Sequence, residues 1–528
     1  MRVLVVESVA PEGLAYLRDR GFEVDELRKP TLDELHAALP SYEALITRSG
    51  TAVTAELLNH APKLRIVGRA GVGVDNVDVD ACSRRGIVVV NAPYGNVVSA
   101  AEHTVGMLHA LVRRIPEAHE RLKTLEWNRA IYGSELFRKT IGVVGLGKVG
   151  SRVAARLGSF DAEVLAYDPY IAEARARDVG ARLVPDFDEL LAAVDVLTVH
   201  VPLTAETERL VAARELAIMK RGVRIVNCAR GGIVHEADLL AALESGHVAG
   251  AAIDVWSEEP PTTETVRRLI QHPRVVVTPH LGANSSEAQV NVGVDVARQF
   301  VAFRDGELVE HAVNIPVGDP AAAAELRPFV ALAERLGSFS VQLDPGPLER
   351  VEVVVAGAIA DRDSELLARA VLTGLLGPVM AEPVNLVNAR LVASERGLTI
   401  AVERGQETGG YKSLLTLVTW TREGRKVVAG TVFDGKPRIA RMRDLDMEFV
   451  PEGFVLVLSY EDRPGVVGKI GTLLGRLNVN IAAMQVGRRA RRGRAIVVLN
   501  LDEGVSTEQL AALASEVEAD FARLVRLP

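Results

Sequence analysis

The segment Gly145-Leu146-Gly147-Lys148-Val149-Gly150 constrains the fold more than any other feature of this sequence. It follows a short apolar run, Ile141–Val144, and it opens a stretch with helical periodicity. Three glycines at this spacing permit a tight turn from strand to helix and let the backbone approach a ligand closely. The sequence therefore predicts a strand, a glycine-rich turn and a helix inside a parallel α/β sheet.

Asp168 ends the next predicted strand, Glu163–Tyr167. A helix N-terminus attracts a pyrophosphate through its free N–H groups and its partial positive charge. A carboxylate at the end of the following strand accepts hydrogen bonds from ribose hydroxyls and repels a 2′-phosphate. A glycine motif alone is a weak signal, but in this context it predicts an NAD site and not a purely structural turn.

Short apolar runs alternate with helical patterns on both sides of this motif, as in doubly wound parallel sheets. With 528 residues, the chain exceeds the roughly 250–300 residues that one core can serve. We predict a Rossmann-type unit at 93–284 and a flavodoxin-like unit at 1–92, completed by 285–314. Further strands of the larger unit are expected at Val194–Val199, Arg224–Asn227, Gly250–Asp254 and Val275–Thr278.

The pattern changes after residue 314. Residues 315–449 contain helical stretches and several predicted strands, which indicates an α+β unit. Residues 450–528 follow the order strand, helix, strand, strand, helix, strand, which is typical of a ferredoxin-like unit. Its expected elements are Phe454–Tyr460, Gly465–Leu477, Val479–Val486, Ala495–Leu501, Thr507–Glu518 and Ala522–Leu527.

Three polar residues, Arg230, Glu259 and His280, follow successive predicted strands, where ligands bind in open α/β sheets. Oxidation of an alcohol needs a hydride acceptor and a base, and His280 suits the base because imidazole titrates near neutrality. Glu259 can orient the imidazole, and Arg230 can hold a carboxylate by two parallel hydrogen bonds. Each residue alone has a structural explanation, but together they predict a hydroxy-acid oxidation site.

The composition disfavours several other classes of protein. A net charge of −8 disfavours attraction to nucleic acid. No run approaches the ~18 apolar residues of a membrane span, and the N-terminal apolar run is too short for a signal peptide. Only two cysteines occur, Cys82 and Cys228, as expected in a reducing compartment. We therefore expect a cytoplasmic protein that binds neither nucleic acid nor membrane, and we expect no metal.

The chain resembles the D-isomer-specific 2-hydroxyacid dehydrogenases, and in particular their long forms with an intervening domain and a C-terminal ACT domain. The resemblance covers the whole length. It implies NAD-dependent oxidation of 3-phospho-D-glycerate to 3-phosphohydroxypyruvate, the first step of L-serine biosynthesis. The matching segments are Arg69–Asp78, Gly145–Gly150, Asn227–Gly232, Asp254–Pro261 and Pro279–Ala283.

The resemblance also implies roles for individual residues. It gives Arg230, Glu259 and His280 as the catalytic residues. Beside Gly145, Gly147 and Gly150, it implies NAD contacts at Val72, Lys148, Val149, Asp168, Val201, Cys228, Ala229, Arg230, Asp254 and His280. It implies substrate contacts at Arg48, Ser49, Gly50, Arg69 and Asn96. Arg48 and Arg69 each follow a predicted strand, so they could supply cations for a phosphorylated substrate, or they could lie on the surface.

In ACT domains, the loop before the first helix and that helix's N-terminus bind an amino acid, often across a dimer interface. The resemblance therefore implies L-serine as an effector, Asp462 and Asn480 as its ligands, and a homotetramer. Asp462 could instead be a helix N-cap.

Two alternatives to this function remain open at the level of sequence. One is another D-2-hydroxyacid dehydrogenase, such as a glyoxylate or hydroxypyruvate reductase. The other is a regulatory protein that senses NAD without turnover. The C-terminal extension of more than 200 residues favours a regulated biosynthetic enzyme over the first, and the presence of all three catalytic residues disfavours the second.

Overall fold

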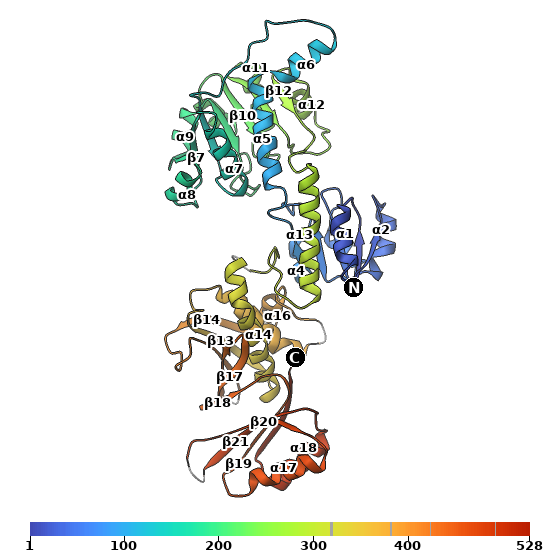
Figure 1. The fold of residues 1–528 in the computed structure, drawn as a ribbon, viewed down its shortest axis with the longest axis vertical. Helices are drawn as coiled ribbons and strands as arrows, with labels where there is room; N and C mark the ends of the chain where they lie inside the picture. The colour runs from blue at the N-terminus through green and yellow to red at the C-terminus, as the bar shows by residue number, and fades with distance from the viewer. Residues whose placement is uncertain (317–319, 381–382, 423, 491–492, 528) are drawn as a thin grey trace.

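A computed structural model describes residues 1–316, 320–380, 383–422, 424–490 and 493–527. Four units follow one another along the long axis of the molecule (Figure 1). The unit with the glycine motif lies at one end of the molecule and the C-terminal unit at the other, so these two units are far apart. The N-terminus lies in the unit that is next to the one with the glycine motif.

The N-terminal unit is an all-parallel sheet of order β2-β1-β3-β4-β5. Strands β1, β3, β4 and β5 are mainly apolar because helices cover both faces, whereas the edge strand β2 has the sequence Glu-Val-Asp-Glu and is mostly exposed. The strands are β1 Arg2–Val5, β2 Glu23–Glu26, β3 Ala44–Thr47, β4 Ile66–Arg69 and β5 Val88–Val90. The helices are α1 Pro11–Arg18, α2 Leu32–Ala38, α3 Ala55–Asn59 and α4 Val79–Arg84, with a 3-10 turn at Leu39–Ser41.

Helix α13 (Ser286–Arg304) belongs to this first sheet, although it comes about 200 residues later in the chain. It crosses α1 with backbones in contact, since a β-carbon on Gly13 would lie 2.6 Å from the carbonyl carbon of Gly293. A β-carbon on Gly68 in β4 would collide with Phe300 of α13. Glycine at these positions therefore lets the helix return and close the apolar core of the unit.

The second unit is also all parallel, with strand order β12-β11-β10-β9-β6-β7-β8. The order reverses between β6 and β9, where open α/β sheets bind ligands. The strands are β6 Thr140–Val144, β7 Glu163–Tyr167, β8 Arg182–Leu183, β9 Val196–Val199, β10 Val223–Asn227, β11 Val248–Ile253 and β12 Val275–Val277. The helices are α5 Val97–Val112, α6 Ile115–Lys123, α7 Lys148–Gly158, α8 Glu173–Asp178, α9 Phe187–Ala193, α10 Ala213–Ile218, α11 Glu236–Glu244 and α12 Glu264–Gln271.

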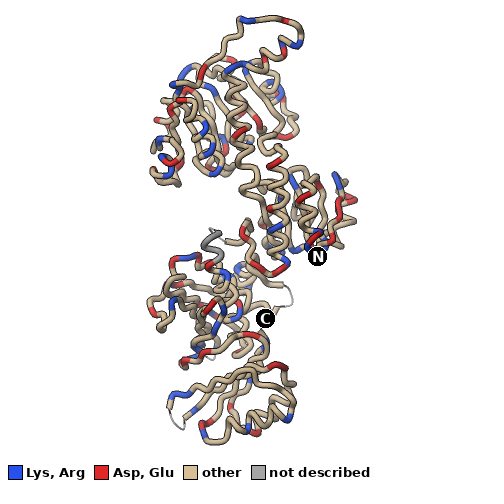
Figure 2. Tube along the Cα trace, viewed as in Figure 1, with Lys and Arg blue, Asp and Glu red and all other residues tan. Residues whose placement is uncertain are grey.

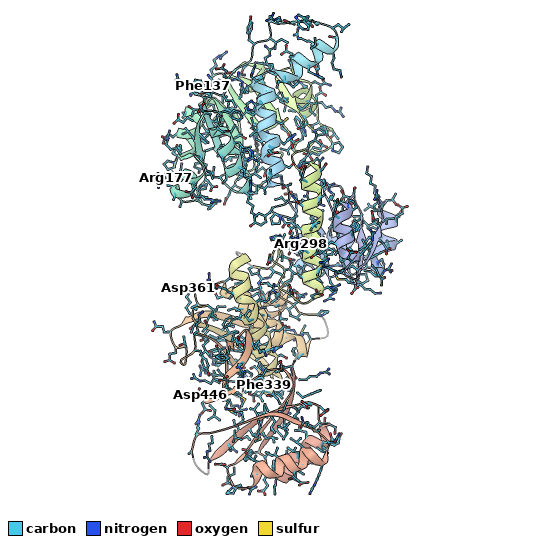
Figure 3. The ribbon with its side chains drawn as sticks, viewed as in Figure 1. Phe137, Arg177, Arg298, Phe339, Asp361 and Asp446 are labelled. Carbon is cyan, nitrogen blue, oxygen red and sulfur yellow. The ribbon has the colours of Figure 1, made fainter. Side chains whose placement is uncertain are left out.

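The third unit is a mixed sheet of order β14-β13-β15-β16-β17-β18, in which only β13 and β14 are parallel. Its helices α14 and α15 pack closely at Gly337 and Gly374, and Phe339 of α14 is fully buried (Figure 3). The strands are β13 Leu348–Gly357, β14 Thr399–Gly405, β15 Ser413–Thr421, β16 Gly424–Phe433, β17 Lys436–Met442 and β18 Leu445–Phe449. The helices are α14 Pro320–Leu343, α15 Ser364–Leu376 and α16 Ala389–Glu395, with a 3-10 turn at Gly377–Val379.

The C-terminal unit is an antiparallel sheet of order β20-β21-β19-β22 with two helices, as predicted for a ferredoxin-like unit. Gln342 of α14 exchanges two hydrogen bonds with the Arg526 backbone, at 2.9 and 3.0 Å, and so joins this unit to the third. The elements are β19 Gly453–Glu461, α17 Val466–Arg476, β20 Ile481–Arg488, β21 Arg494–Leu501, α18 Thr507–Val517 and β22 Phe521–Leu527.

The predicted fold class is confirmed: two doubly wound parallel sheets precede a mixed α+β unit and a ferredoxin-like unit. The proposed divisions after residues 92, 284, 314 and 449 all fall in connections between elements. Basic and acidic residues are interspersed over all four units (Figure 2). No helix of the described residues has the length and apolar composition needed to cross a membrane.

Candidate active site

Of the three glycines in the turn between β6 and α7, two are in close contact with the protein and Gly147 borders open space. Gly145 has a φ of +86°, and a β-carbon there would lie 2.8 Å from the carbonyl oxygen of His200. A β-carbon on Gly150 would lie 2.0 Å from the Gly145 oxygen, so this glycine lets the helix pack against the strand. A β-carbon on Gly147 would meet no heavy atom within 4 Å. The open side of the turn is therefore at Gly147.

The start of α7 offers the backbone donors that a pyrophosphate needs. Gly147 is its N-cap residue and provides no side-chain cap, so the first N–H groups of the helix face the open side of the turn. Asp168 lies directly beside this turn, where its carboxylate accepts the N–H of Leu146 at 2.8 Å and that of Tyr170 at 3.0 Å. These residues fit an adenine dinucleotide that carries free ribose hydroxyls.

Three loops at the carboxyl edge of the same sheet converge, as predicted. Arg230 follows β10, Glu259 follows β11 and His280 follows β12, and these strands are neighbours. The first two loops touch, since a β-carbon on Gly231 would lie 1.9 Å from the Trp256 oxygen. The second and third are joined by a contact between Glu259 and His280.

The Glu259–His280 pair leaves one imidazole nitrogen available for chemistry. His280 Nδ1 lies 2.8 Å from Glu259 Oε2, and the Trp256 N–H donates to the other carboxylate oxygen at 3.0 Å. Burial alone would raise the pKa of Glu259, but these hydrogen bonds outweigh it and the pKa is lowered. An ionised Glu259 makes Nδ1 the donor, so Nε2 carries the lone pair that can accept a proton.

Arg230 reaches across from the second unit to the first. Its Nε lies 3.3 Å from Asp75 Oδ2, and Nη1 donates to its neighbour Ala229 O at 2.7 Å. Its Nη2 rests on Gly73, where a β-carbon would approach to 2.3 Å. Arg230 of the second unit is therefore in direct contact with Gly73 and Asp75 of the first unit.

Arg69 places a second guanidinium group near that of Arg230. It folds over Gly71, and its Nε is buried without a hydrogen-bond partner among the described residues. Burial lowers the pKa of Arg69 to about 10, and the charge of Arg230 contributes to this shift. Arg48 is also close enough to act on it electrostatically. A desolvated cation beside two others is a site for an anionic ligand.

The Arg48–Thr51 loop is held from below by Glu7, a residue that the sequence analysis did not select. Its carboxylate accepts the N–H groups of Arg48, Gly50 and Thr51 at 2.9–3.0 Å and the Thr47 hydroxyl at 3.0 Å. Asn76 donates to two carbonyls of the same loop at 2.6 Å. Glu7 comes two residues after the end of strand β1, so the strand-end rule that selected Arg48 and Arg69 would also have found it.

Replacing Glu7 by glutamine should therefore raise KM for the anionic substrate about tenfold and leave kcat within about threefold, since a charge-assisted hydrogen bond contributes roughly 1.5–3 kcal/mol.

Burial alone would raise the pKa of Glu7, but the hydrogen bonds from Arg48, Gly50 and Thr47 lower it. A lowered folded-state pKa stabilises the protein above the unfolded pKa of about 4.3 and not below the folded value. The melting-temperature difference between the two proteins should thus be largest at neutral pH and shrink below about pH 4. Glu12→Gln on the nearby helix α1 is the control, and an unchanged KM in Glu7→Gln would contradict this role.

Three family models match the chain. The NAD binding domain of D-isomer specific 2-hydroxyacid dehydrogenases matches residues 105–282, the D-3-phosphoglycerate dehydrogenase intervening domain matches 325–443, and the ACT domain matches 454–518. Curated relatives include D-3-phosphoglycerate dehydrogenase of Archaeoglobus fulgidus, 42% identical over 99% of this chain and 100% of the relative. The Bacillus subtilis enzyme of that name is 40% identical over the full length of both.

The chain belongs to the D-3-phosphoglycerate dehydrogenase family. Its first two units also match solved structures. The TT0316 protein of Thermus thermophilus is 31% identical, with a TM-score of 0.55 over 59% of this chain and all of its own. NAD-dependent formate dehydrogenase of Staphylococcus aureus in complex with NAD is 33% identical, with a TM-score of 0.52 over 58% of this chain and 97% of its own. As a member of its family, this chain is an NAD-dependent oxidoreductase.

Most of the other residues expected to contact NAD lie in the second unit, and Val72 lies in the first unit, after β4. Val201 lies against Gly145, and the Lys148 ammonium lies 3.7 Å from the centre of the Tyr94 ring. Val149 and Cys228 are partly buried beside one core cluster, and Ala229 beside another. The Val72 oxygen accepts a hydrogen bond from Asn91. Asn96, which was expected to contact the substrate, is the N-cap residue of helix α5 at the crossing between the units. Asp254 is fully buried below the His280 loop.

The two expected effector ligands lie at opposite ends of the ACT sheet. Asp462 follows the β19 residue Glu461, which pairs with Arg494, whereas Asn480 precedes Ile481, which pairs with Leu501. Asp462 is paired with Arg488, and Asn480 donates to Asp502 at 2.7 Å. Asp462 is not the N-cap of α17, because Gly465 occupies that position. One subunit does not bring both residues to the same small molecule.

Proposed function

We propose that this chain oxidises 3-phospho-D-glycerate to 3-phosphohydroxypyruvate with NAD, as the first step of L-serine biosynthesis. The observation that carries the proposal is the cluster of Arg48, Arg69 and Arg230 at the cleft, in which the buried Arg69 has an unpaired Nε. Asp75 and Glu7 offset only part of this positive charge, and a substrate with a carboxylate and a phosphate would supply the rest. The residue assignments of the sequence analysis are part of the proposal.

In the proposed reaction, Arg230 holds the substrate carboxylate and polarises the oxygen on C2. His280 Nε2 takes the hydroxyl proton, and Glu259 stabilises the imidazolium that forms. Bound NAD supplies the acceptor for the hydride that leaves C2. Asp168 and the turn at Gly147 hold the cofactor, and closure of the two units around the cleft excludes water.

The experiment follows NADH absorbance with 3-phosphohydroxypyruvate beside hydroxypyruvate and glyoxylate. We expect kcat/KM to favour the phosphorylated acid strongly, because the matched unphosphorylated acid leaves cations at the cleft unpaired. A preference for an unphosphorylated acid would move the function to another D-2-hydroxyacid dehydrogenase. Absence of turnover with all three would support an NAD-sensing protein without catalysis.

We propose L-serine as an inhibitor that binds between two ACT units. The paired strands separate Asp462 from Asn480 by roughly 20 Å, so an antiparallel partner copy is needed to place Asp462 beside Asn480 of the partner subunit. Asp462→Ala should raise the serine concentration for half-inhibition about 10–100-fold, since one hydrogen bond to the ammonium group is lost. Glu516→Ala on the outer helix α18 is the control. Equal serine sensitivity of all three proteins would contradict Asp462 as a ligand.

A second interface is proposed at the segment 115–137, which extends from the end of the NAD unit (Figure 1). It exposes a series of large apolar side chains, which marks a site of protein contact. Together with paired ACT units at the opposite end of the molecule, two such interfaces can close into a homotetramer. The exposed residues are Ile115, Leu122, Leu125, Trp127, Tyr132 and Phe137.

Trp127→Ala should weaken this interface, because Trp127 is 80% exposed in the single chain and tryptophan is prominent among interface hot spots. We expect the subunit dissociation constant to rise at least tenfold in sedimentation velocity runs over a dilution series. Phe433→Ala, which removes an exposed aromatic ring from a hairpin of the third unit, is the control. If the two variants dissociate alike, the segment is not an interface.

We also infer a cytoplasmic location. Both cysteines, Cys82 and Cys228, are free. Free thiols are expected in a reducing compartment.

A further inference from the structure

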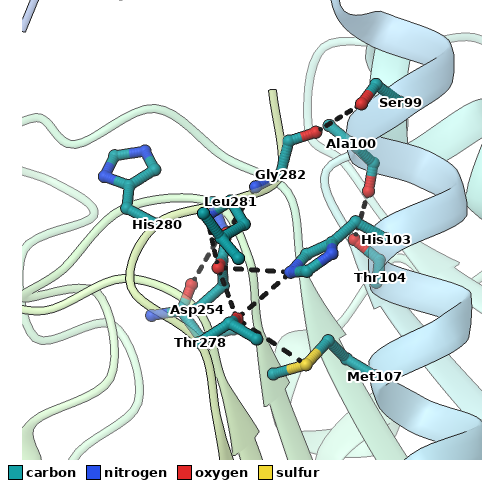
Figure 4. Close-up of polar contacts among 12 residues, drawn as sticks. Ser99, Ala100, His103, Thr104, Met107, Asp254, Thr278, His280, Leu281 and Gly282 are labelled. Carbon is teal, nitrogen blue, oxygen red and sulfur yellow. Dashed lines mark hydrogen bonds and ion pairs between the residues drawn. The ribbon is translucent and has the colours of Figure 1, made fainter. Parts of the chain in front are cut away.

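The loop 278–282 carries His280, and it is held by Asp254 and by residues of helix α5. Figure 4 shows this loop between the end of β12 and the helix α5. His280 has a φ of +55°, in the left-handed region that costs a non-glycine residue on the order of 1 kcal/mol or more. Such a conformation persists only where the surroundings enforce it. The enforcing contacts therefore bear directly on where the imidazole points.

Asp254 provides most of these contacts from beneath the loop. Its backbone oxygen accepts the His280 N–H at 2.8 Å, and its carboxylate accepts the N–H groups of Leu281 and Gly282 at 2.7 and 2.9 Å. The Thr278 hydroxyl donates to the same carboxylate at 2.5 Å. The Asp254 side chain is only 1% exposed, so its charge must be stabilised by such donors.

His103 on α5 contacts this arrangement from the side. Its Nε2 lies 3.2 Å from Asp254 Oδ1 and 3.1 Å from Thr278 Oγ1. The carboxylate can only accept, and Thr278 already donates its one proton to Asp254. Nε2 must therefore carry a proton and share it between the two oxygens. The geometry thus selects the protonation state of this nitrogen.

We infer that His103 is a positioning residue for hydride transfer, which acts through Asp254 and Thr278 to hold the His280 loop in its reactive conformation. This inference rests on the proposed role of His280 as the base. No sequence motif singled out His103, because a histidine inside a helix has an ordinary structural explanation. The contacts of His103 with Asp254 and Thr278 are the basis for this positioning role.

The position of His103 on α5 extends its effect beyond one hydrogen bond. Helix α5 directly follows the crossing from the first unit, and Ser99 in its first turn donates to the Gly282 oxygen at 2.9 Å. The loop is thus held at both ends by one helix. A shift of the reacting groups by about 1 Å can reduce a rate about 10²-fold without any loss of substrate contacts. Loss of the His103 donor should therefore affect kcat more than KM.

The test compares His103→Ala and His103→Gln with the wild type in the full-length protein. Each is assayed with NADH and whichever of the three 2-oxo acids the wild type reduces fastest. We expect kcat of His103→Ala to fall about 10–100-fold, with KM and the NADH dissociation constant within about threefold. The deuterium isotope effect with NADH labelled at C4 should rise, because hydride transfer becomes rate-limiting. The glutamine amide can donate one hydrogen bond, so His103→Gln should recover part of the rate.

His109 provides a matched control on the same helix. It packs against Phe160 and does not contact the 278–282 loop, so His109→Gln should keep the wild-type isotope effect. Melting temperature and NADH binding identify a variant that fails to fold, in which case His103→Gln carries the test. An unchanged kcat and isotope effect in folded His103→Ala would overturn the inference. A wild type that prefers an unphosphorylated acid would overturn the proposed substrate and leave this inference standing.

Discussion

His280→Asn should reduce kcat by about 10²–10⁴-fold, the range that general acid–base catalysis contributes. Asparagine can still donate a hydrogen bond toward Glu259, but it cannot accept a proton at the position of Nε2. The NADH dissociation constant, measured by fluorescence titration, should change little, because His280 is only one of the expected NAD contacts and the glycine turn and Asp168 lie on the other side of the sheet reversal.

Glu259→Gln is the informative companion to this variant. It keeps the size of the side chain and removes the charge that stabilises the imidazolium, so we expect a smaller loss of kcat than in His280→Asn. If His280→Asn retained wild-type turnover, the base would have to be another group. A loss of NADH binding parallel to the loss of rate would instead indicate a structural role for the loop.

Arg230→Lys should lower kcat/KM about 10–100-fold, although the positive charge is kept. The planar guanidinium can offer two parallel hydrogen bonds to the substrate carboxylate, whereas the ammonium offers a point charge. Loss of one hydrogen bond to a charged group costs roughly 1.5–3 kcal/mol, and each 1.4 kcal/mol is tenfold in rate. Steady-state assays over a range of substrate concentrations separate the effects on kcat and KM.

Arg224→Lys, on the preceding strand β10 and away from the cleft loops, is the matched control for an arginine-to-lysine change in this unit. Arg230→Ala should be more severe than Arg230→Lys, because it also leaves Asp75 without its partner. Equal kcat/KM in Arg230→Lys and wild type would argue against a bidentate contact with the carboxylate.

Those features that depend on local pattern could be predicted from the sequence. The glycine turn, the alternation of strands and helices, and the residues after strand ends all follow from short-range rules. Arg230, Glu259 and His280 could be selected because parallel strands bring their carboxyl ends to one edge. The contact between Glu259 and His280 agrees with that expectation, because the two residues follow neighbouring strands.

The contacts that support these residues could not be predicted in the same way. His103 touches Asp254 across about 150 residues of sequence, and its helix has an ordinary pattern. The Arg230–Asp75 pair joins two units whose relative placement no local pattern encodes. Even Asp462 and Asn480, close in sequence, lie at opposite ends of a sheet because the strand register separates them. Long-range geometry decides all of these cases.

The return of α13 to the first sheet makes the NAD unit an insertion within another unit. Its two ends, near Tyr94 and Asn284, line one cavity of about 470 Å³, so they lie close together. A segment with neighbouring ends can be excised or transplanted as a module. The excised module would keep the base and the cofactor turn but lose Arg69. The first unit would keep its apolar core after this excision only if α13 were retained, since Phe300 of α13 fills that core.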